Sequence, residues 1–458
     1  MDRSLSEIAN AVGGRVSAGD GLFMIKGVVT DSRKVTSGSL FFALKGEHHD
    51  GHDFASQVFF RGGAAVVSRP IEGGPTIEVN DCLEALQKLA AYHRNQYDIP
   101  VIAVTGSVGK TTTKDLLAAC LEGSRKTLKT PGNYNTEIGL PLTLLGLEAE
   151  HQACVVELAM RAEGEISLLS RIAQPTGCII VNVAPVHLET MGTLENIVRA
   201  KCEVLDYTSD FAVINGDLPE LSEARFPRGE LYRFGFGYDC DWRVITCSYH
   251  PPVTKFELDI TKRNIVLSLP FPATHLSGSV AAAVGTAMLL GVSPQDIAER
   301  LLHFQPSAGR LNLKQSVNGT AIIDDSYNAN PLSMKAALRV LNDWAGSRRK
   351  IAVLGDMFEL GSEEIEGHRS VGREAAAIGP DILLAIGQRA RYLVESARES
   401  GFSGVLAHFN NKADAINFLG NEVRPGDVVL VKASRGMHLE EVVETLLQMN
   451  ESTSFKEA

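Results

Sequence analysis

The strongest chemical signal in the chain is a glycine turn that leads into Lys110 and Thr111, within Val101-Ile-Ala-Val-Thr-Gly-Ser-Val-Gly-Lys-Thr-Thr-Thr-Lys114. The apolar, β-branched residues before the turn predict a buried strand, and the residues after it predict a helix. Such a turn aims backbone amides and a helix N-terminus at phosphate oxygens. Lys110 would reach the β- and γ-phosphates of a nucleotide, and the Thr111 hydroxyl would hold Mg²⁺. We therefore predict a nucleotide-phosphate site formed by Gly106, Ser107, Val108, Gly109, Lys110, Thr111 and Thr112.

This motif departs at one position from the phosphate-loop pattern G-x-x-x-x-G-K-[ST], because Val104 stands where the first glycine belongs. The alternative is an ordinary glycine turn before an amphipathic helix. Strand, glycines, Lys-Thr and helix nevertheless follow one another in the order that phosphate binding requires, which favours that interpretation. A partition-type ATPase loop also ends in Gly-Lys-Thr-Thr, but it has a lysine where this chain has Thr105.

Length and composition limit the classes of protein to which the chain can belong. Its 458 residues exceed one typical domain and predict two or three. The net charge of −11 argues against a general nucleic-acid surface. No apolar run approaches about 18 residues and the first residues lack the apolar core of a signal peptide, so we expect no membrane insertion. Seven cysteines without paired metal or disulfide spacing fit a reducing cytoplasm.

Two changes in pattern divide the chain, one at Asp98-Ile-Pro100 and one near Ser307-Ala-Gly-Arg310. We predict an α/β fold of three domains from the alternation of apolar runs and helical stretches. Residues 1–97 would form a small N-terminal α/β domain. Residues 98–306 would form a central domain with a mostly parallel sheet of the phosphate-loop ATPase type, and residues 307–458 a C-terminal, Rossmann-like, doubly wound domain.

Four further positions could carry chemistry, and each has a structural alternative. Glu157 ends an apolar run and fits a hard Mg²⁺ ligand, although a strand-end carboxylate can also form a surface ion pair. His187 follows another apolar run on a loop, where a lone histidine is more often structural. Asn133 and Asn135 lie in a polar loop whose alternative is turn chemistry. Arg310 lies at the predicted junction, where it could reach a phosphate after domain closure or form a linker salt bridge.

These motifs resemble those of the Mur ligase family. The stretches that carry the resemblance in the predicted central and C-terminal domains are Thr105–Thr113, Asn133–Pro141, Glu157, His187, Ala200-Lys-Cys-Glu203, Gly309-Arg310, Asp324–Pro331, Val353–Gly361 and Lys432-Ala-Ser-Arg-Gly436. Two N-terminal segments resemble the family's UDP-binding domain, namely Asp31-Ser-Arg33 and Leu40–Gly46. The Asp-Asn-Pro-Arg motif of the family's tripeptide synthetase is absent.

The resemblance implies an ATP-dependent carboxylate–amine ligase of peptidoglycan synthesis. The carboxylate of UDP-N-acetylmuramoyl-tripeptide would attack the γ-phosphate of ATP to give an acyl phosphate. The amine of D-alanyl-D-alanine would then displace phosphate to form the UDP-linked pentapeptide. The third residue of the peptide, lysine or diaminopimelate, stays open. We expect a cytoplasmic monomer that does not bind nucleic acid and does not insert into a membrane.

The resemblance also assigns roles residue by residue. Catalytic roles fall on Lys110, Lys201, His187, Asn133 and Asn135. Nucleotide binding extends to Arg310, Asp325, Asn328 and Asn330, with Asp325 on the ribose. The ligands of two Mg²⁺ ions would be Thr111, Glu157, His187 and a carbamylated Lys201. Contacts with the UDP-substrate would come from Ser32, Arg33, Lys45, Gly46, Asp50, His52, Asn135 and Thr136.

One departure from the family pattern concerns the adenine base. Relatives show His-Asn-x-x-Asn near His275, whereas this chain has Leu276 and Ser279 at the two asparagine positions. Two other functions stay open. One is a Mur-type or folylpolyglutamate-type ligase that uses a different amine. The other is a nucleotide-dependent switch without ligase activity, which would not need Glu157, His187 and Lys201 together.

Overall fold

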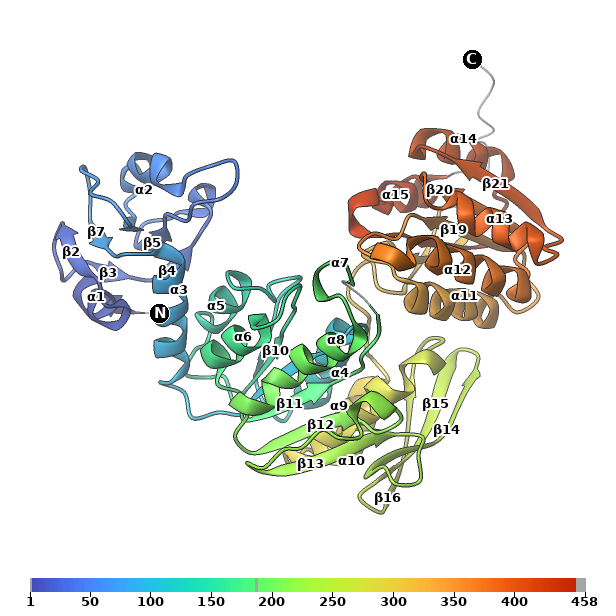
Figure 1. The fold of residues 1–458 in the computed structure, drawn as a ribbon, viewed down its shortest axis with the longest axis horizontal. Coiled ribbons are helices and arrows are strands. Elements are labelled where there is room, and N and C mark those ends of the chain that lie inside the picture. The colour runs from blue at the N-terminus through green and yellow to red at the C-terminus, as the bar shows by residue number, and fades with distance from the viewer. Residues whose placement is uncertain (1, 186–187, 450–458) are drawn as a thin grey trace.

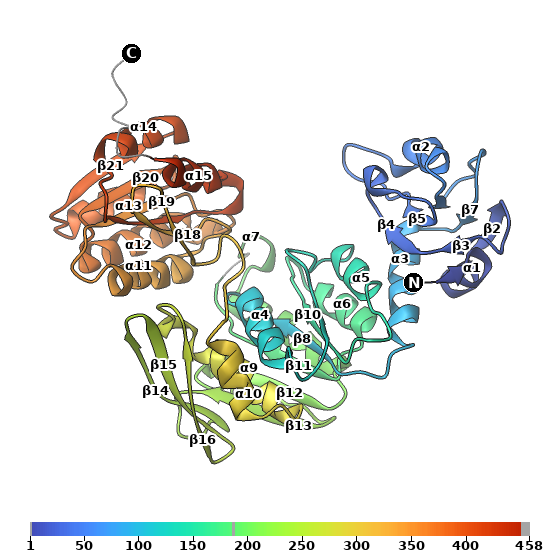
Figure 2. The same ribbon diagram turned by 180° about the vertical axis from the view of Figure 1, so that it is seen from behind.

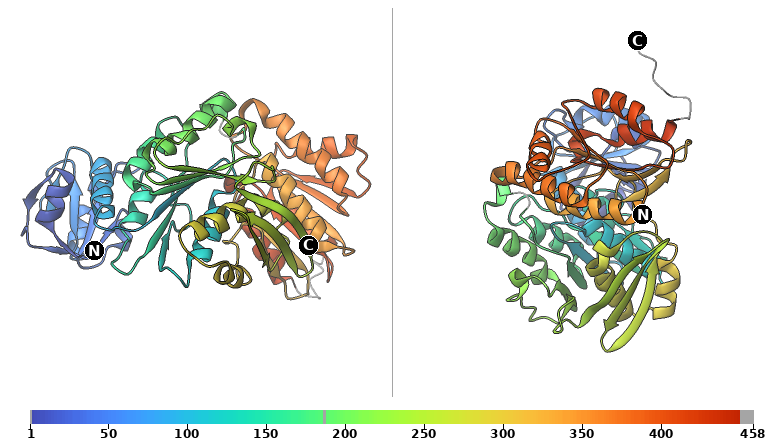
Figure 3. Two further views of the ribbon diagram at one scale, coloured as in Figure 1. Left: turned by 90° about the horizontal axis from the view of Figure 1, so that it is seen from below. Right: turned by 90° about the vertical axis from the view of Figure 1, so that its right-hand side faces the viewer.

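The computed structural model describes residues 2–185 and 188–449 and arranges them as three successive α/β domains (Figure 1). The N-terminal and C-terminal domains lie at opposite ends of the central domain, as the view from behind also shows (Figure 2). The view from below places the central sheet between the two outer domains (Figure 3). Among the helices of the described chain, none combines the length and apolar character needed to cross a bilayer.

The N-terminal domain is built on a sheet with the strand order β2-β7-β6-β5-β4, parallel except for the β2–β7 pair. Its elements are β1 (Arg3–Ser4), α1 (Leu5–Val12), β2 (Arg15–Ala18), β3 (Met24–Ile25), β4 (Gly27–Val29), β5 (Ser39–Phe42), α2 (Ala55–Phe60), β6 (Ala64–Val67), β7 (Thr76–Glu78) and α3 (Cys82–Arg94). Helix α3 begins at Asp81, whose carboxylate accepts a hydrogen bond from the backbone N–H of Glu84. It packs on α1 and also on two helices of the central domain, so it joins the two domains.

The central domain contains a nine-stranded sheet within the described residues, in the order β16-β15-β14-β13-β12-β11-β8-β10-β9. Neighbours are parallel from β9 to β14, and β14, β15 and β16 pair antiparallel. The elements are β8 (Val101–Thr105), α4 (Lys110–Leu121), β9 (Thr127–Lys129), α5 (Gly139–Leu144), β10 (Ala153–Glu157), α6 (Glu165–Ala173), β11 (Gly177–Ile180), α7 (Leu188–Met191), α8 (Leu194–Cys202), β12 (Phe211–Asn215), β13 (Glu230–Gly235), β14 (Trp242–His250), β15 (Val253–Ile260), β16 (Arg263–Leu269), α9 (Ser277–Leu289) and α10 (Pro294–Leu301).

Burial explains the continuous apolar runs of this sheet. Every residue of β8, β10 and β11 is buried, because helices cover both faces of a parallel sheet. The alanine-rich helix α9 packs against α4 and against β13 and β14. Its small side chains permit a close approach, and a methyl group on Gly285 would lie 2.2 Å from Cδ2 of the fully buried Trp242.

The C-terminal domain is a doubly wound sheet of order β17-β18-β22-β19-β20-β21, parallel except for β17. Apolar residues of α11, α12 and α13 cover one face, and those of α14 and α15 cover the other. The elements are β17 (Asn312–Gln315), β18 (Ala321–Asp325), α11 (Pro331–Ala345), β19 (Lys350–Gly355), α12 (Glu364–Ile378), β20 (Ile382–Ile386), α13 (Arg391–Glu399), β21 (Val405–Phe409), α14 (Lys412–Glu422), β22 (Val428–Lys432) and α15 (Glu440–Gln448). The three-domain α/β architecture expected from the sequence is confirmed.

Candidate active site at the central and C-terminal domains

A cleft of about 910 Å³ lies between the central and C-terminal domains. The central domain contributes the turn between β8 and α4, the loop after β9 and the end of β10. The C-terminal domain contributes the residues around Arg310, the segment from Asp325 to Ser333, and the segment after β22. The cleft therefore collects the ends of parallel strands from two sheets, which is where open α/β sheets place ligands.

The glycine turn between β8 and α4 is shaped by two glycines with positive φ angles and by hydrogen bonds within the central domain. Gly106 and Gly109 have φ angles of +154° and +84°, which side chains with a Cβ rarely adopt. The backbone N–H of Val108 donates to Oδ1 of Asn182 at 2.8 Å, and the Lys110 ammonium donates to the carbonyl of Gly106 at 2.8 Å. Burial lowers the pKa of Lys110, and the carboxylate of Glu157 opposes this shift. A phosphate at this position would add negative charge beside the partly buried ammonium and would favour its charged form.

Glu157 is the centre of a hydrogen-bond cluster at the end of β10. Its side chain accepts from the Thr111 hydroxyl at 2.7 Å and from the Asn135 amide at 2.7 Å. Its backbone N–H donates to the Thr130 hydroxyl at 2.9 Å. The carboxylate is only 2% exposed, so the alternative of a surface ion pair does not describe it. Asn133 and Thr136 also line the cleft.

Lys201 lies on α8 and is almost fully buried. Burial lowers the pKa of its ammonium well below the usual value, and the charge of Lys110 lowers it further. No hydrogen bond or ion pair joins this ammonium to any residue in the described ranges, and Lys201 does not itself line the cleft. The neighbouring Glu203 accepts from two backbone N–H groups at the start of α6. His187, the other predicted ligand on this side, lies outside the described residues.

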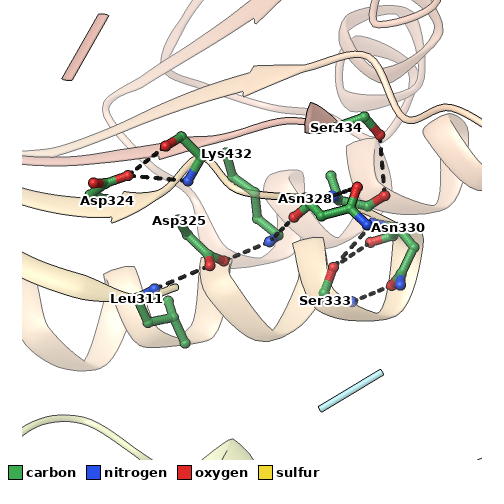
Figure 4. Close-up of polar contacts among 10 residues, drawn as sticks. Leu311, Asp324, Asp325, Asn328, Asn330, Ser333, Lys432 and Ser434 are labelled. Carbon is green, nitrogen blue, oxygen red and sulfur yellow. Dashed lines mark hydrogen bonds and ion pairs between the residues drawn. The ribbon is translucent and has the colours of Figure 1, made fainter. Parts of the chain in front are cut away.

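The C-terminal wall is organised by an ion pair between Asp325 and Lys432 (Figure 4). Lys432 lies 2.6 Å from Oδ2 of Asp325 and donates to the carbonyl of Asn328 at 2.8 Å. The other oxygen of Asp325 accepts from the backbone N–H of Leu311 at 3.1 Å. Burial raises the pKa of Asp325, and Lys432 opposes that shift. The pairing of Lys432 with Asp325 could not be expected from its motif alone.

Asn330 and Asn328 both use their side chains within the domain. The Asn330 side chain accepts from the backbone N–H of Ser333 at 2.9 Å, while the Ser333 hydroxyl accepts from the backbone N–H of Asn330 (Figure 4). This capping box, followed by Pro331, starts α11. The Asn328 side chain accepts from the backbone N–H of Ala329. Both residues line the cleft, so their main observed role is to shape its wall.

Arg310 reaches the cleft from the segment between α10 and β17. Its guanidinium lies 4.2 Å from the centre of the Tyr327 ring, and Arg435 lies 5.6 Å from the same ring. No carboxylate of the described chain forms an ion pair with Arg310, so the linker salt bridge is not what the structure shows there. An aromatic ring can hold a guanidinium in place while leaving its N–H groups available to an anion.

His275 lies next to Leu276 and near Ser279, the two residues that replace the asparagines of the family pattern. Both of its ring nitrogens are buried in the wall of the cleft, although the residue as a whole is partly exposed, and neither nitrogen has a hydrogen-bond partner among the described residues. Burial lowers its pKa to about 4, with a further contribution from Lys432. The Ser279 hydroxyl accepts from the Thr113 hydroxyl at 2.9 Å, and Leu276 is buried. The neutral imidazole is therefore a donor and an acceptor without partners beside the nucleotide-phosphate loop.

The residues predicted to contact the UDP-substrate lie in the N-terminal domain, except Asn135 and Thr136. Ser32 and Arg33 form a short 3-10 helix, and this helix and the segment 51–54 both pack against α2. Arg33 is exposed and pairs with Asp31 at 2.8 Å. Lys45 and Gly46 lie in a turn that is closed by an isolated antiparallel β-bridge between the backbones of Lys45 and Asp50.

His52 has a structural environment. It is 7% exposed, its Nδ1 lies 2.5 Å from Oδ1 of Asp50, and its Nε2 accepts from the backbone N–H of Ser68 at 2.9 Å. Both ring nitrogens therefore have partners within the domain. The pKa of Asp50 is lowered most by the hydrogen bond from the backbone N–H of His52 and next by the hydrogen bond with the His52 imidazole.

Comparison with known proteins gives a consistent result along the whole chain. Three family models match in order: "Mur ligase family, catalytic domain" at residues 24–94, "Mur ligase middle domain" at residues 104–287, and "Mur ligase, glutamate ligase domain" at residues 309–435. The UDP-N-acetylmuramoyl-tripeptide–D-alanyl-D-alanine ligase of Bacillus subtilis is 37% identical over 93% of this chain and 94% of its own length. The Escherichia coli protein of the same name is 35% identical over 97% of this chain and 98% of its own length.

Solved structures agree with the sequence comparisons. A crystal structure of MurF from Acinetobacter baumannii matches with a TM-score of 0.90 and 35% identity, covering 98% of this chain and 99% of that one. The MurF ligase of Thermotoga maritima, solved in complex with ADP, matches with a TM-score of 0.81 and 29% identity, covering 92% of this chain and 97% of that one. On these similarities and on the cleft described above, the chain belongs to the Mur ligase family.

Proposed function

We propose that this chain joins D-alanyl-D-alanine to UDP-N-acetylmuramoyl-tripeptide at the expense of ATP and so forms the UDP-linked pentapeptide of peptidoglycan synthesis. The full-length similarity to enzymes of that name supports the choice of substrates. One structural observation supports the chemistry more than any other. Glu157, Thr111 and Asn135 form a buried oxygen-rich cluster next to Lys110, opposite Arg310 on the other wall of the cleft.

The reaction brings anions together, and the cleft supplies what that requires. An oxygen of the tripeptide carboxylate attacks the γ-phosphorus of ATP, the bond to the β-phosphate oxygen breaks, and ADP leaves. The amine nitrogen then attacks the carbonyl carbon of the acyl phosphate, inorganic phosphate leaves, and the amine loses a proton. Lys110 and Arg310 neutralise the phosphate oxygens during transfer, which is the main catalytic demand of phosphoryl transfer.

The residues at the end of β10 fit the Mg²⁺ that this chemistry uses. Carboxylate and hydroxyl oxygens are ligands that Mg²⁺ prefers, and Glu157 and Thr111 supply one of each in direct contact, while the Asn135 amide N–H₂ donates to the other oxygen of the carboxylate. When bound, the metal would screen the charges of phosphate and carboxylate. We assign Glu157 and Thr111 to this role, and the family resemblance adds His187 as a further ligand.

We further propose that Lys201 is carbamylated. Its ammonium is buried, its pKa is lowered well below the usual value, and the positive Lys110 is the largest nearby influence. These conditions favour the neutral amine, which can add CO₂. The carbamate would be an anion close to cationic groups and could serve a second Mg²⁺ together with His187.

The remaining contacts come from all three domains. Ser32, Arg33, Lys45, Gly46 and Asp50 would hold the UDP part of the substrate, with Thr136 nearer the peptide. Since His52 uses both ring nitrogens internally, we expect it to hold Asp50 in place rather than to touch the substrate. Asp325 would bind the ribose, and Arg310 would reach the phosphates. All seven cysteines fall in the described ranges and none forms a disulfide, which fits a cytoplasmic protein. One chain supplies every residue assigned here, so the proposed site does not require a second copy of the chain.

Product analysis tests this proposal. The chain is incubated with ATP, Mg²⁺, D-alanyl-D-alanine and UDP-N-acetylmuramoyl-tripeptide, in separate reactions with lysine and with diaminopimelate as the third residue. We expect a nucleotide product heavier by one dipeptide less one water in at least one reaction. D-Alanine and L-alanyl-L-alanine serve as control amines. A product with another amine but not with D-alanyl-D-alanine would favour a ligase of different specificity, and ATP hydrolysis without any ligation product would favour a nucleotide-dependent switch.

A further inference from the structure

Helix α4 carries a buried pair of opposite charges that does not line the cleft. Lys114 and Asp115 are 2% and 4% exposed, and the Lys114 ammonium lies 3.3 Å from Oδ1 of Asp115. Consecutive residues of a helix point in different directions, so their side chains do not normally face each other. A buried charge pair adds little to stability by itself, because desolvation offsets the attraction. The pair therefore calls for another explanation, and its remaining contacts provide one.

Asp115 holds the segment that connects the central and C-terminal domains. The Ser307 hydroxyl donates to Oδ2 of Asp115 at 2.5 Å. The carbonyl of Ser307 accepts from the backbone N–H of Arg310 at 3.1 Å, so residues 307–310 form a tight turn, here named the interdomain turn. Arg310 ends this turn and places its guanidinium on Tyr327 inside the cleft. The hydrogen bond from Ser307 thus attaches the base of the Arg310 arm to the phosphate-loop helix.

Lys114 holds the opposite side of the same site. Its ammonium donates to the carbonyl of Thr130 at 2.7 Å, and Thr130 is fully buried. The Thr130 hydroxyl in turn accepts from the backbone N–H of Glu157 at 2.9 Å. Thr130 begins the loop that carries Asn135, whose amide contacts the Glu157 carboxylate. One buried ion pair therefore connects the interdomain turn to the strand end that presents Glu157.

We propose that Asp115 and Lys114 are positioning residues that anchor two parts of the site to one helix: the interdomain turn that carries Arg310 and the strand end that presents Glu157 on the opposite wall of the cleft. This inference rests on the proposed ligase function for its kinetic consequences. Asp115 acts through Ser307 on Arg310, and Lys114 acts through Thr130 on Glu157. Because Asp115 anchors the interdomain turn, the C-terminal domain moves about a point fixed to the phosphate-loop helix. Arg310 therefore returns to one position each time the cleft closes.

Ser307→Ala is the sharpest test, because Ser307 is an exposed residue whose hydroxyl is not needed to fill the core. Loss of the hydrogen bond that holds the interdomain turn should displace Arg310 from the phosphates, and we expect kcat/KM for ATP to fall about tenfold. The KM for the UDP-substrate and the melting temperature should stay close to those of the unmodified chain. Ser307→Thr keeps a hydroxyl and should restore most of the loss. Lys129→Met removes the exposed ammonium 3.3 Å from Asp115 without touching the turn and serves as the matched control.

A double-mutant cycle shows whether Ser307 acts through Arg310. In an Arg310→Ala background, Ser307→Ala should cause no further loss of affinity for a non-hydrolysable ATP analogue, measured by calorimetry with the UDP-substrate present. A change of less than twofold in both assays for Ser307→Ala alone would overturn the proposal, and so would an equal loss in the presence and absence of Arg310. The calorimetric cycle does not depend on turnover. If the unmodified chain fails to form the ligation product, the proposed ligase function is refuted. The calorimetric cycle would still show whether Ser307 acts on nucleotide binding through Arg310.

Discussion

His275 is the residue whose surroundings most clearly link burial to function. Its ring is enclosed in the cleft wall, lacks a partner for either nitrogen in the described structure, and has a pKa of about 4. In the unfolded chain an imidazole has a pKa of about 6.5. The stabilising contribution of the neutral ring is therefore complete above about pH 6.5 and is lost as the pH falls toward 4.

We predict that His275→Leu removes part of the acid sensitivity of the protein. Between pH 7 and pH 5 the unmodified chain should lose about 2 kcal/mol more of its unfolding free energy than the variant does, from the titration of this group alone. Urea unfolding of both proteins at the two pH values measures the difference. Parallel losses in the two proteins would show that the ring titrates normally in the folded state.

Lys201 gives the second prediction at this scale. If its carbamate supplies an anion at the site, Lys201→Ala should be nearly inactive, and small carboxylates such as acetate or formate should restore part of the activity. Mass analysis of the intact protein in the presence of ¹³CO₂ under trapping conditions provides a readout apart from turnover. Full activity of the variant, or an amine that stays unmodified at saturating CO₂, would refute the assignment.

The sequence predicted Lys110, Thr111, Glu157 and Asn135 as one site, and the structure places them together. They follow strands of one parallel sheet, whose carboxyl ends meet at the same edge. The residue types alone left Glu157 and Asn135 with structural alternatives, and the resemblance to the Mur ligase family was needed to predict them as part of this site. The ion pair of Lys432 with Asp325 and the contact of Asp115 with Ser307 could not be predicted in this way. They join residues 107 and 192 positions apart, and nothing in the local pattern specifies such contacts.

At the scale of elements, continuous apolar runs predicted the buried central strands. They did not predict the partly exposed strand at the edge of the C-terminal sheet. The apolar run before the glycine turn and the run that Glu157 ends are fully buried strands, β8 and β10. Strand β21 lies at the edge of its sheet and is half exposed, so its apolar pattern was too weak to single out. Packing between elements was also invisible in the sequence, as the contact between α9 and Trp242 illustrates.

That contact predicts the effect of Gly285→Ala. A methyl group 2.2 Å from the Trp242 ring would overlap with a fully buried side chain. Overpacking costs about 3 kcal/mol, and the better helix propensity of alanine returns only about 1 kcal/mol. Chemical denaturation should therefore show a central domain less stable by about 2 kcal/mol. Gly27→Ala in β4, where the added methyl group meets no atom within 4 Å, is the control, and equal stability of the two variants would contradict this packing argument.

At the scale of the whole molecule, the proposed ATP contacts lie on two domains. Lys110 belongs to the central domain, whereas Arg310 and Asp325 lie at the start of the C-terminal domain. A productive site therefore requires the C-terminal domain to close onto the central domain, with residues 307–313 as the hinge. We predict that a non-hydrolysable ATP analogue together with the UDP-substrate reduces the radius of gyration measured by small-angle X-ray scattering. Scattering curves that do not change on addition of both ligands would count against closure.

We propose that one cleft first activates the substrate carboxylate with ATP and then passes the acyl group to the amine. The transfer of an oxygen atom from the carboxylate to phosphate distinguishes this sequence of steps from others. UDP-N-acetylmuramoyl-tripeptide labelled with ¹⁸O in its reacting carboxylate is incubated with the chain, ATP, Mg²⁺ and D-alanyl-D-alanine, and the released phosphate is analysed by mass. We predict that each phosphate carries one oxygen from the carboxylate, because the acyl phosphate breaks between carbon and that oxygen. Phosphate that contains no label while the peptide bond forms, or that is released at the same rate without the labelled substrate, would contradict it.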